Sequence, residues 1–165
     1  MIKKNIHIKL LQQVPEHFAQ VAQWHHDECE RQGLQSSLAT RQQRLLLHVQ
    51  HSAIPKTLVI LNDAQVVGCV SLVNYTYRTD ASVLIPANSA PVWLSNLYVL
   101  DAVRGQGLGN LLIEAAKRYA VALGAADLWL SAAEYTDYYQ RRGWETTRKT
   151  RLGGRQVNVM RIALE

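Results

Sequence analysis

Three alternate glycines, Gly105, Gly107 and Gly109, follow an apolar run near the middle of the chain. The run before them, Trp93 to Leu100, is typical of a buried strand, and the residues after them have helical spacing. Glycine lets the backbone approach a ligand closely, and the first amides of a helix have no partner within it. Because the helix dipole is positive at this end, the turn is predicted to bind an anion, and a pyrophosphate would fit.

The predicted helix ends before Gly124, which stands where a C-terminal cap belongs. We expect Glu114, Lys117 and Arg118 to take the side of the helix away from the core. The apolar residues expected on the inward side are Leu108, Leu111, Leu112, Ala115, Tyr119 and Leu123.

Two common phosphate-binding motifs do not match this turn. The dinucleotide fingerprint requires a glycine where Asn110 stands, and the triphosphate-binding loop requires a Gly-Lys-Ser/Thr that the sequence lacks. What remains is Arg104-x-x-Gly107-x-Gly109 after a strand that ends in Leu97-Tyr98-Val99. This arrangement resembles the acyl-coenzyme A signature of the GNAT superfamily of N-acetyltransferases. The alternative is a glycine-rich turn without a ligand.

A second segment carries the same resemblance. Asp127 to Ser131 is predicted to be a strand and Thr136 to Arg142 a helix. In the GNAT family this helix carries Tyr-x-x-x-Gly-aromatic, which Tyr139, Gly143 and Trp144 match, with Tyr138 in the apolar place before. The resemblance implies that Tyr139 protonates the departing thiolate. The alternative is an ordinary core tyrosine.

The resemblance also implies acetyl-coenzyme A as cosubstrate and direct attack of a neutral amine on the thioester. The amides of Leu97, Tyr98 and Val99 would then hold the acetyl carbonyl and the pantetheine arm, as an added strand would. The pyrophosphate would lie on the backbone amides of Arg104, Gly105, Gln106, Gly107, Leu108, Gly109 and Asn110.

The acceptor side departs from the family pattern. Ala132 stands where many relatives carry an asparagine that contacts the pantetheine, and Tyr135 stands where an alanine is expected. Many relatives place a glutamate on the strand before the glycine turn to accept the amine proton, but residues 92–100 contain no acid or histidine. The general base stays open: Ser95 and Asn96 could order a relay water, and the groups that could receive the proton are Glu134, Asp137, His25 and His26.

Composition predicts one domain over residues 1–165, because 48% hydrophobic residues in a chain of this length can form a core without disulfides or metal. Cys29 and Cys69 are expected to be reduced core residues. The cluster from His25 to Cys29 lacks the spacing of a zinc site, so no metal is expected.

Without a signal peptide or an apolar run that could cross a bilayer, we expect a cytoplasmic protein with no membrane partner.

The net charge is +5, and basic residues crowd the last quarter of the chain. A solvated face is the leading interpretation, coenzyme phosphate is the next, and nucleic acid is the least favoured because no aromatic platform accompanies the charges. We therefore expect no specific nucleic-acid partner. The residues concerned are Arg141, Arg142, Arg148, Lys149, Arg151 and Arg155.

The expected fold class is α/β (α+β): a single GNAT-type domain with a central, mixed, mostly antiparallel sheet flanked by helices. The resemblance implies splayed parallel strands at the coenzyme site. Turn residues between Leu61 and Val66 predict a hairpin, and Thr79 to Pro91 is expected to be irregular. The other predicted strands are Ile6–Leu11, Trp144–Thr150 and Gln156–Leu164; the first two helices are Pro15–Glu30, with Phe18, Val21 and Ala22 inward, and Ser37–His51, with Leu38, Leu45, Leu46 and Val49 inward.

These features favour an acetyl-coenzyme A-dependent N-acetyltransferase that acts on a primary amine of a small molecule or peptide. The resemblance also allows a homodimer. Two alternatives stay open, an RNA-directed acetyltransferase and a non-catalytic acyl-coenzyme A sensor, because fold alone does not decide between them. The first fifty or so residues are generic, and the choice of acceptor is expected to reside there.

Overall fold

The computed structural model describes residues 5–50, 53–74, 91–152 and 154–164. Seven strands form one sheet in the order β1-β2-β3-β4-β5-β7-β6, and every neighbouring pair except β4 and β5 is antiparallel. This mixed, mostly antiparallel sheet confirms the predicted fold class. The strands are β1 (Ile6–Leu10), β2 (Lys56–Asn62), β3 (Gln65–Asn74), β4 (Val92–Val99), β5 (Asp127–Ala132), β6 (Glu145–Leu152) and β7 (Arg155–Ala163).

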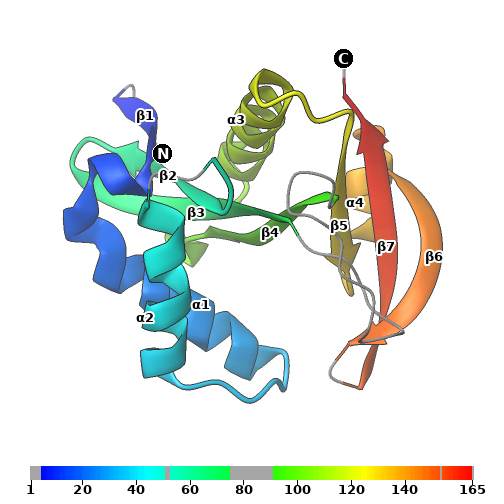
Figure 1. Ribbon diagram of the computed structural model, residues 1–165, viewed down its shortest axis with the longest axis horizontal. Helices are drawn as coiled ribbons and strands as arrows, with labels where there is room; N and C mark the ends of the chain where they lie inside the picture. Colours follow the sequence, from blue (N-terminus) through cyan, green and yellow to red (C-terminus); the bar gives the residue numbers. More distant parts are fainter. Residues whose placement is uncertain (1–4, 51–52, 75–90, 153, 165) are drawn as a thin grey trace.

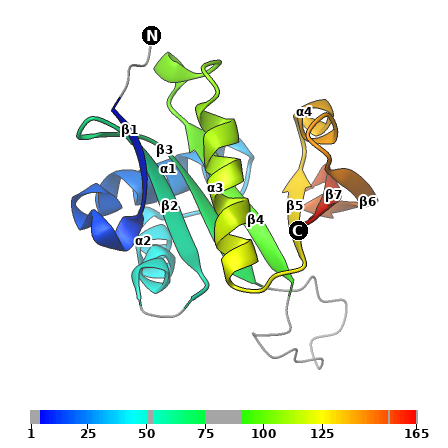
Figure 2. The same cartoon turned by 90° about the horizontal axis from the view of Figure 1, so that it is seen from above.

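The helices cover both faces of the first four strands. Figure 1 shows α3 (Leu108–Ala122) above β2, β3 and β4, and α1 (Phe18–Arg31) and α2 (Leu38–Leu46) below them. Figure 2 shows that the other three strands form a second group with the short helix α4 (Thr136–Gln140). Two separate apolar cores follow from this layering, one on the α3 side of the sheet and one beneath α1 and α2.

The first two helices were predicted in the correct order, and the bounds of the first are nearly correct. The chain enters α1 through a short 3-10 turn, and Val21 and Ala22 are fully buried as expected. The second helix is shorter than predicted, because α2 gives way to a 3-10 turn over residues 47–49 and Gln50 is extended. The inward orientation predicted for Leu46 is wrong, since this residue is 51% exposed while Leu45 is buried.

The inward face of α3 is rotated from the predicted one. Leu111 and Leu123 are exposed. The residues that face the sheet are Leu108, Leu112, Ile113, Ala116 and Ala120. The helix packs closely on β3, because a Cβ at Gly68 would lie 3.3 Å from the Leu112 side chain. The C-terminal cap at Gly124, with φ of 86°, is confirmed.

The remaining predicted elements agree with the structure to within a few residues. The β2–β3 hairpin closes through Asp63, whose φ of 55° suits a tight turn, and β6 pairs with β7 as the last hairpin. The irregular segment predicted for Thr79 to Pro91 lies outside the described residues except for Pro91, and so do His51 and Gly153.

Candidate active site

Strands β4 and β5 are parallel neighbours that pair at one position and then diverge. Their register contains the single pair Trp93–Trp129, and the two rings lie 5.9 Å apart. A bulge causes the divergence: the four residues from Ser95 to Tyr98 oppose the three from Cys69 to Ser71 on β3, and Asn96 takes a left-handed conformation with φ of 54°. The predicted splay is thereby confirmed.

The divergence leaves one edge of β4 without a strand partner in the described part of the chain beyond Trp93. Backbone groups alternate in direction along a strand, and the Leu100 amide donates to the Val67 carbonyl on β3. The amides of Leu97 and Val99 therefore face the open edge, whereas that of Tyr98 faces β3. An extended ligand could add to this edge as a strand would.

The glycine turn follows β4 and leads into α3. Gly105 and Gly107 have φ of 80° and 83°, which side chains other than glycine rarely adopt, and Gly107 caps the helix. A Cβ at either glycine would meet no atom within 4 Å, so the backbone borders open space. The first amides of α3, those of Leu108, Gly109 and Asn110, have no acceptor within the helix. This surface suits a diphosphate.

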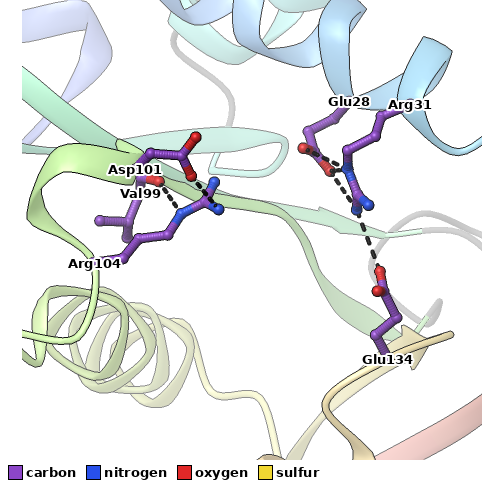
Figure 3. Close-up of polar contacts among 6 residues, drawn as sticks. All are labelled: Glu28, Arg31, Val99, Asp101, Arg104 and Glu134. Atoms are coloured by element: carbon purple, nitrogen blue, oxygen red, sulfur yellow. Dashed lines mark hydrogen bonds and ion pairs between the residues drawn. The ribbon is translucent and has the colours of Figure 1, made fainter.

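The Arg104 side chain holds the turn rather than facing this open space. Its Nε atom donates to the Val99 carbonyl over 2.7 Å, and its guanidinium forms an ion pair with Asp101 (Figure 3). The guanidinium also lies over the Tyr98 ring, 5.4 Å from the ring centroid. The Arg104 amide also donates within the turn, to the Asp101 carbonyl. Arg104 thus fastens the turn to the end of β4.

Tyr139 lies on α4, half-buried against the core on the α3 side. Its ring makes edge contacts with Tyr138, at 5.3 Å between centroids, and with Trp144, at 6.0 Å. Burial, followed by the neighbouring Tyr138 and Tyr135, raises the pKa of Tyr139 to about 12. The hydroxyl therefore keeps its proton at neutral pH and can serve as a donor.

Side chains from α4 and from the turn after it also reach the start of α3. The Arg142 guanidinium stacks 3.6 Å from the Tyr138 ring centroid, and its Nε atom donates to Asn110 over 3.2 Å. A Cβ at Gly109 would lie 4.0 Å from the Tyr138 hydroxyl. The two predicted motifs, far apart in the sequence, are therefore neighbours in space on the same side of the splay.

On the opposite side of the sheet, the C-terminal end of α1 extends over the splay. Arg31 makes three hydrogen bonds to the Glu28 carboxylate, and its Nη2 atom lies 3.4 Å from Glu134 in the connection between β5 and α4. Figure 3 shows this ion-pair chain reaching from α1 to the β5 side. Acidic and basic groups thus line the side of the splay opposite to α3.

The four groups considered as proton acceptors have different environments. Glu134 forms an ion pair with Arg31, and Asp137 is exposed in the first turn of α4. His26 is held between Ser36 and Glu30. His25 is buried, and its Nε2 atom bonds to no described residue; burial, then His48 and Arg41, lowers its pKa to about 4. This pKa makes His25 a weak base at neutral pH.

Sequence reasoning missed Glu28 and Arg31. It considered His25 and His26 as proton acceptors, but it treated the rest of the cluster from His25 to Cys29 only as a metal site to be rejected. No group of His, Cys, Asp and Glu among the described residues is arranged to hold a metal ion. The signal that could have identified Glu28 is its spacing from Val21 and Trp24, which places it on the buried stripe of α1. An acid on such a stripe indicates a specific role.

A cavity of about 760 Å³ lies between the end of α1 and the start of α2. Its lining is mostly polar and includes Ser36, Thr40, Arg41 and Arg44. Arg41 has a buried Nε atom without a hydrogen bond to a described residue.

None of the described helices is long and apolar enough to span a membrane.

Comparison with solved structures finds this fold many times. A GNAT-family acetyltransferase from Streptococcus pneumoniae is 18% identical, with a TM-score of 0.69 over 98% of this chain and 100% of that one. A Salmonella typhimurium protein solved with its cofactor acetyl-CoA is 15% identical, with a TM-score of 0.70 over 98% and 95%. N-acetylglutamate synthase from Neisseria gonorrhoeae, complexed with coenzyme A and N-acetyl-glutamate, is 18% identical, with a TM-score of 0.66 over 99% of this chain and 36% of that one.

A search by sequence among curated proteins finds no match. The family model for the acetyltransferase (GNAT) domain matches residues 54–146, which include β2 to β5, the glycine turn, α3 and α4. This range is more than half of the chain and contains both motifs. The protein therefore belongs to the GNAT family and is an acyltransferase that transfers acetyl groups.

Proposed function

We propose that this protein transfers the acetyl group of acetyl-coenzyme A to a primary amine of a small molecule or peptide. The observation that carries the proposal is the splay between β4 and β5, which has the glycine turn with open space beside it on the α3 side and ion-paired carboxylates on the α1 side. One ligand can approach from each side of the sheet. Their reactive ends would then meet at the bulge in β4.

The residues present fit the coenzyme. The open space at Gly105 and Gly107 and the first amides of α3 suit its pyrophosphate, and the outward amides of Leu97 and Val99 suit the amide groups of its pantetheine arm. The coenzyme supplies an activated acetyl thioester. The Val99 amide at the open edge would stabilise negative charge on the thioester oxygen.

Tyr139 is the residue that we assign to protonate the sulfur. With a pKa of about 12, its hydroxyl is more than three units less acidic than a thiol in water, a gap of roughly 5 kcal/mol. Burial raises the pKa of a thiol as well, so the gap narrows within the site. Such a cost is compatible with the 8 kcal/mol or more by which enzymes commonly lower barriers.

The test is acetyl transfer to a panel of amino acids, polyamines, aminoglycosides and peptides with a free N-terminus. We expect release of the coenzyme thiol that depends on one class of amine, and a product heavier by one acetyl group. Binding of acetyl-coenzyme A without transfer to any amine would reject the proposal and favour a sensor.

A further inference from the structure

Glu28 occupies a position on α1 where the sequence pattern calls for an apolar residue. It follows Val21 and Trp24 on the inward stripe, and its side chain is 27% exposed. Trp24, one turn earlier and about 6 Å back along the helix, packs on Tyr98 of β4 with 4.9 Å between ring centroids. Glu28 therefore lies over β4, toward the splay.

The ion pairs from Glu28 through Arg31 to Glu134 place the Glu28 carboxylate beside the splay, and its charge acts on two titratable groups of β3 and β4. Burial raises the pKa of the Cys69 thiol to about 12, and Glu28 adds to the shift. Burial also raises the pKa of Tyr98, and the charge of Glu28 adds to that rise. Since the Cys69 sulfur lies 3.5 Å from the Asn96 carbonyl oxygen in the bulge, Glu28 is near the point where β4 turns away from β5.

The Glu28 carboxylate is also held in one orientation. Arg31 contacts both of its oxygens over 3.1 to 3.3 Å and is itself tied to Glu134. An ionised carboxylate has about four acceptor sites, so this pairing leaves capacity for another donor. The groups coupled directly to Glu28 or to its partner Arg31 are Cys69, Tyr98 and Glu134, and the other charges that act on Tyr98 are Arg104, Asp101 and Asp27.

We propose that Glu28 is the general base, which accepts the proton of the acceptor amine, and that Arg31 positions it. The inference rests on the proposed amine acetylation. Glu28 lies on the α1 side of the splay, opposite to the phosphate-binding turn, where the acceptor would enter (Figure 3). No other described acid combines a half-buried position on α1 with coupling to both β3 and β4.

Two residues of the protein, Glu28 and Tyr139, accept and donate the protons that move in the reaction. The nitrogen lone pair of a neutral amine forms the C–N bond, and one N–H proton passes to Glu28. The C–S bond breaks, and the sulfur takes the proton of the Tyr139 hydroxyl. Solvent then returns the proton from Glu28 to Tyr139. The net change is the transfer of one acetyl group to nitrogen and one proton to sulfur.

The experiment compares Glu28→Gln, Glu28→Asp, Glu134→Gln and the matched control Glu30→Gln. Glu30 is an exposed acid on the same helix that pairs with His26 on another face. The readouts are single-turnover transfer to the most reactive amine of the panel, its dependence on pH, and coenzyme A affinity by calorimetry. Calorimetry does not depend on turnover, so it separates catalysis from folding and binding.

We expect Glu28→Gln to lose about a hundredfold or more in rate, the usual scale of general base catalysis, and to lose the rise of the rate with pH at the acidic end. Glu28→Asp should recover part of the rate, Glu30→Gln should match the wild type, and coenzyme A affinity should stay the same throughout. Glu134→Gln should lose less than Glu28→Gln.

Three results would overturn the inference. A wild-type rate in Glu28→Gln excludes Glu28 as the base, and a larger loss in Glu134→Gln assigns that role to Glu134. A parallel loss of rate and coenzyme A affinity in Glu28→Gln makes the residue structural. If the wild type acetylates no amine, the proposed function itself fails, and the inference fails with it.

Discussion

At the scale of single residues, two adjacent tyrosines differ in what their hydroxyls can do. Burial raises the pKa of the Tyr139 hydroxyl to about 12, whereas the Tyr138 ring serves as a platform for the Arg142 guanidinium. Removing the Tyr139 hydroxyl leaves the edge contacts with Tyr138 and Trp144 intact, because they involve only the ring. A tyrosine-to-phenylalanine pair can therefore isolate the chemistry from the packing.

We predict that Tyr139→Phe lowers single-turnover acetyl transfer by about a hundredfold or more while coenzyme affinity is retained. Tyr138→Phe keeps the ring beneath Arg142 and should have nearly the wild-type rate. The measurement is rapid-quench transfer with saturating acetyl-coenzyme A. If Tyr138→Phe is slow and Tyr139→Phe is not, the motif has been assigned one residue out of place.

The residue scale is also where the sequence was least informative about the acceptor side. Motif spacing pointed to Gly107 and Tyr139 because both belong to short, local patterns. Glu28 pairs with Arg31 on its own helix, but Arg31 reaches Glu134, and the Glu28 charge acts on Tyr98 and Cys69, only after folding. No local pattern encodes contacts between segments so distant in the chain, and this is why the base stayed open.

At the scale of elements, the turn from β4 into α3 depends on backbone that only glycine adopts without strain. Gly107 and Gly124 mark the two ends of α3, with φ of 83° and 86°, and a Cβ at either would meet nothing within 4 Å. A side chain at either position carries a similar backbone cost, on the order of 1 kcal/mol or more. Only the first position borders the space proposed for the pyrophosphate.

We therefore predict that acetyl-coenzyme A raises the melting temperature of the wild type, since a ligand that binds only the folded state stabilises it. Gly107→Val should abolish the shift and weaken coenzyme binding in calorimetry by about tenfold or more. Gly124→Val should lose similar stability but keep the affinity. Unchanged affinity in folded Gly107→Val would show that the turn is not the phosphate site.

The order and type of the elements followed from the sequence because strand and helix periods are local properties. The faces were less predictable. On α3 the large residues Leu111 and Leu123 were expected inside, but both are exposed, and Ala116 and Ala120 face the sheet together with Leu112 and Ile113. Helical periodicity predicts the spacing of the buried residues along a helix, but it does not predict which of two overlapping faces packs against the sheet.

At the scale of the whole molecule, the basic residues of the last quarter separate into two places. Arg142 reaches the start of α3, whereas Arg148, Lys149 and Arg151 lie exposed on β6, the edge strand of the sheet (Figure 1). Charged side chains on an edge strand hinder pairing with other chains. The basic residues that are close in sequence are thus separated in space. The charges on β6 have an explanation that requires no ligand.

For this reason we predict no specific binding of nucleic acid. Gel-shift titration with RNA and DNA at about 150 mM salt should show affinities no tighter than about micromolar, the non-specific range, and these should weaken steeply as salt is added. Tighter, sequence-dependent binding at this salt would contradict the prediction and restore the RNA-directed alternative.

A buried polar network beneath α1 and α2 couples the stability of the whole molecule to pH. His48 Nδ1 lies 2.9 Å from the Thr57 hydroxyl, which lies 2.8 Å from that of Ser71. Burial is the main reason that the pKa values of both His48 and His25 fall to about 4. Both imidazoles are therefore neutral in the folded protein at the pH where the unfolded chain begins to protonate them, near 6.5.

Between pH 6.5 and 4 the unfolded state then binds more protons than the folded state, so the free energy of unfolding should fall as the pH is lowered through this range. A shift of this size corresponds to about 3 kcal/mol for each histidine once pH 4 is reached.

Urea unfolding at about pH 8, 6.5 and 5 measures the effect. His48→Gln keeps a hydrogen-bonding side chain near Thr57 but cannot titrate; its stability should therefore vary less between pH 6.5 and 5 than that of the wild type. Equal unfolding free energies for the wild type at all three pH values would show that the buried histidines take up protons without opening the core.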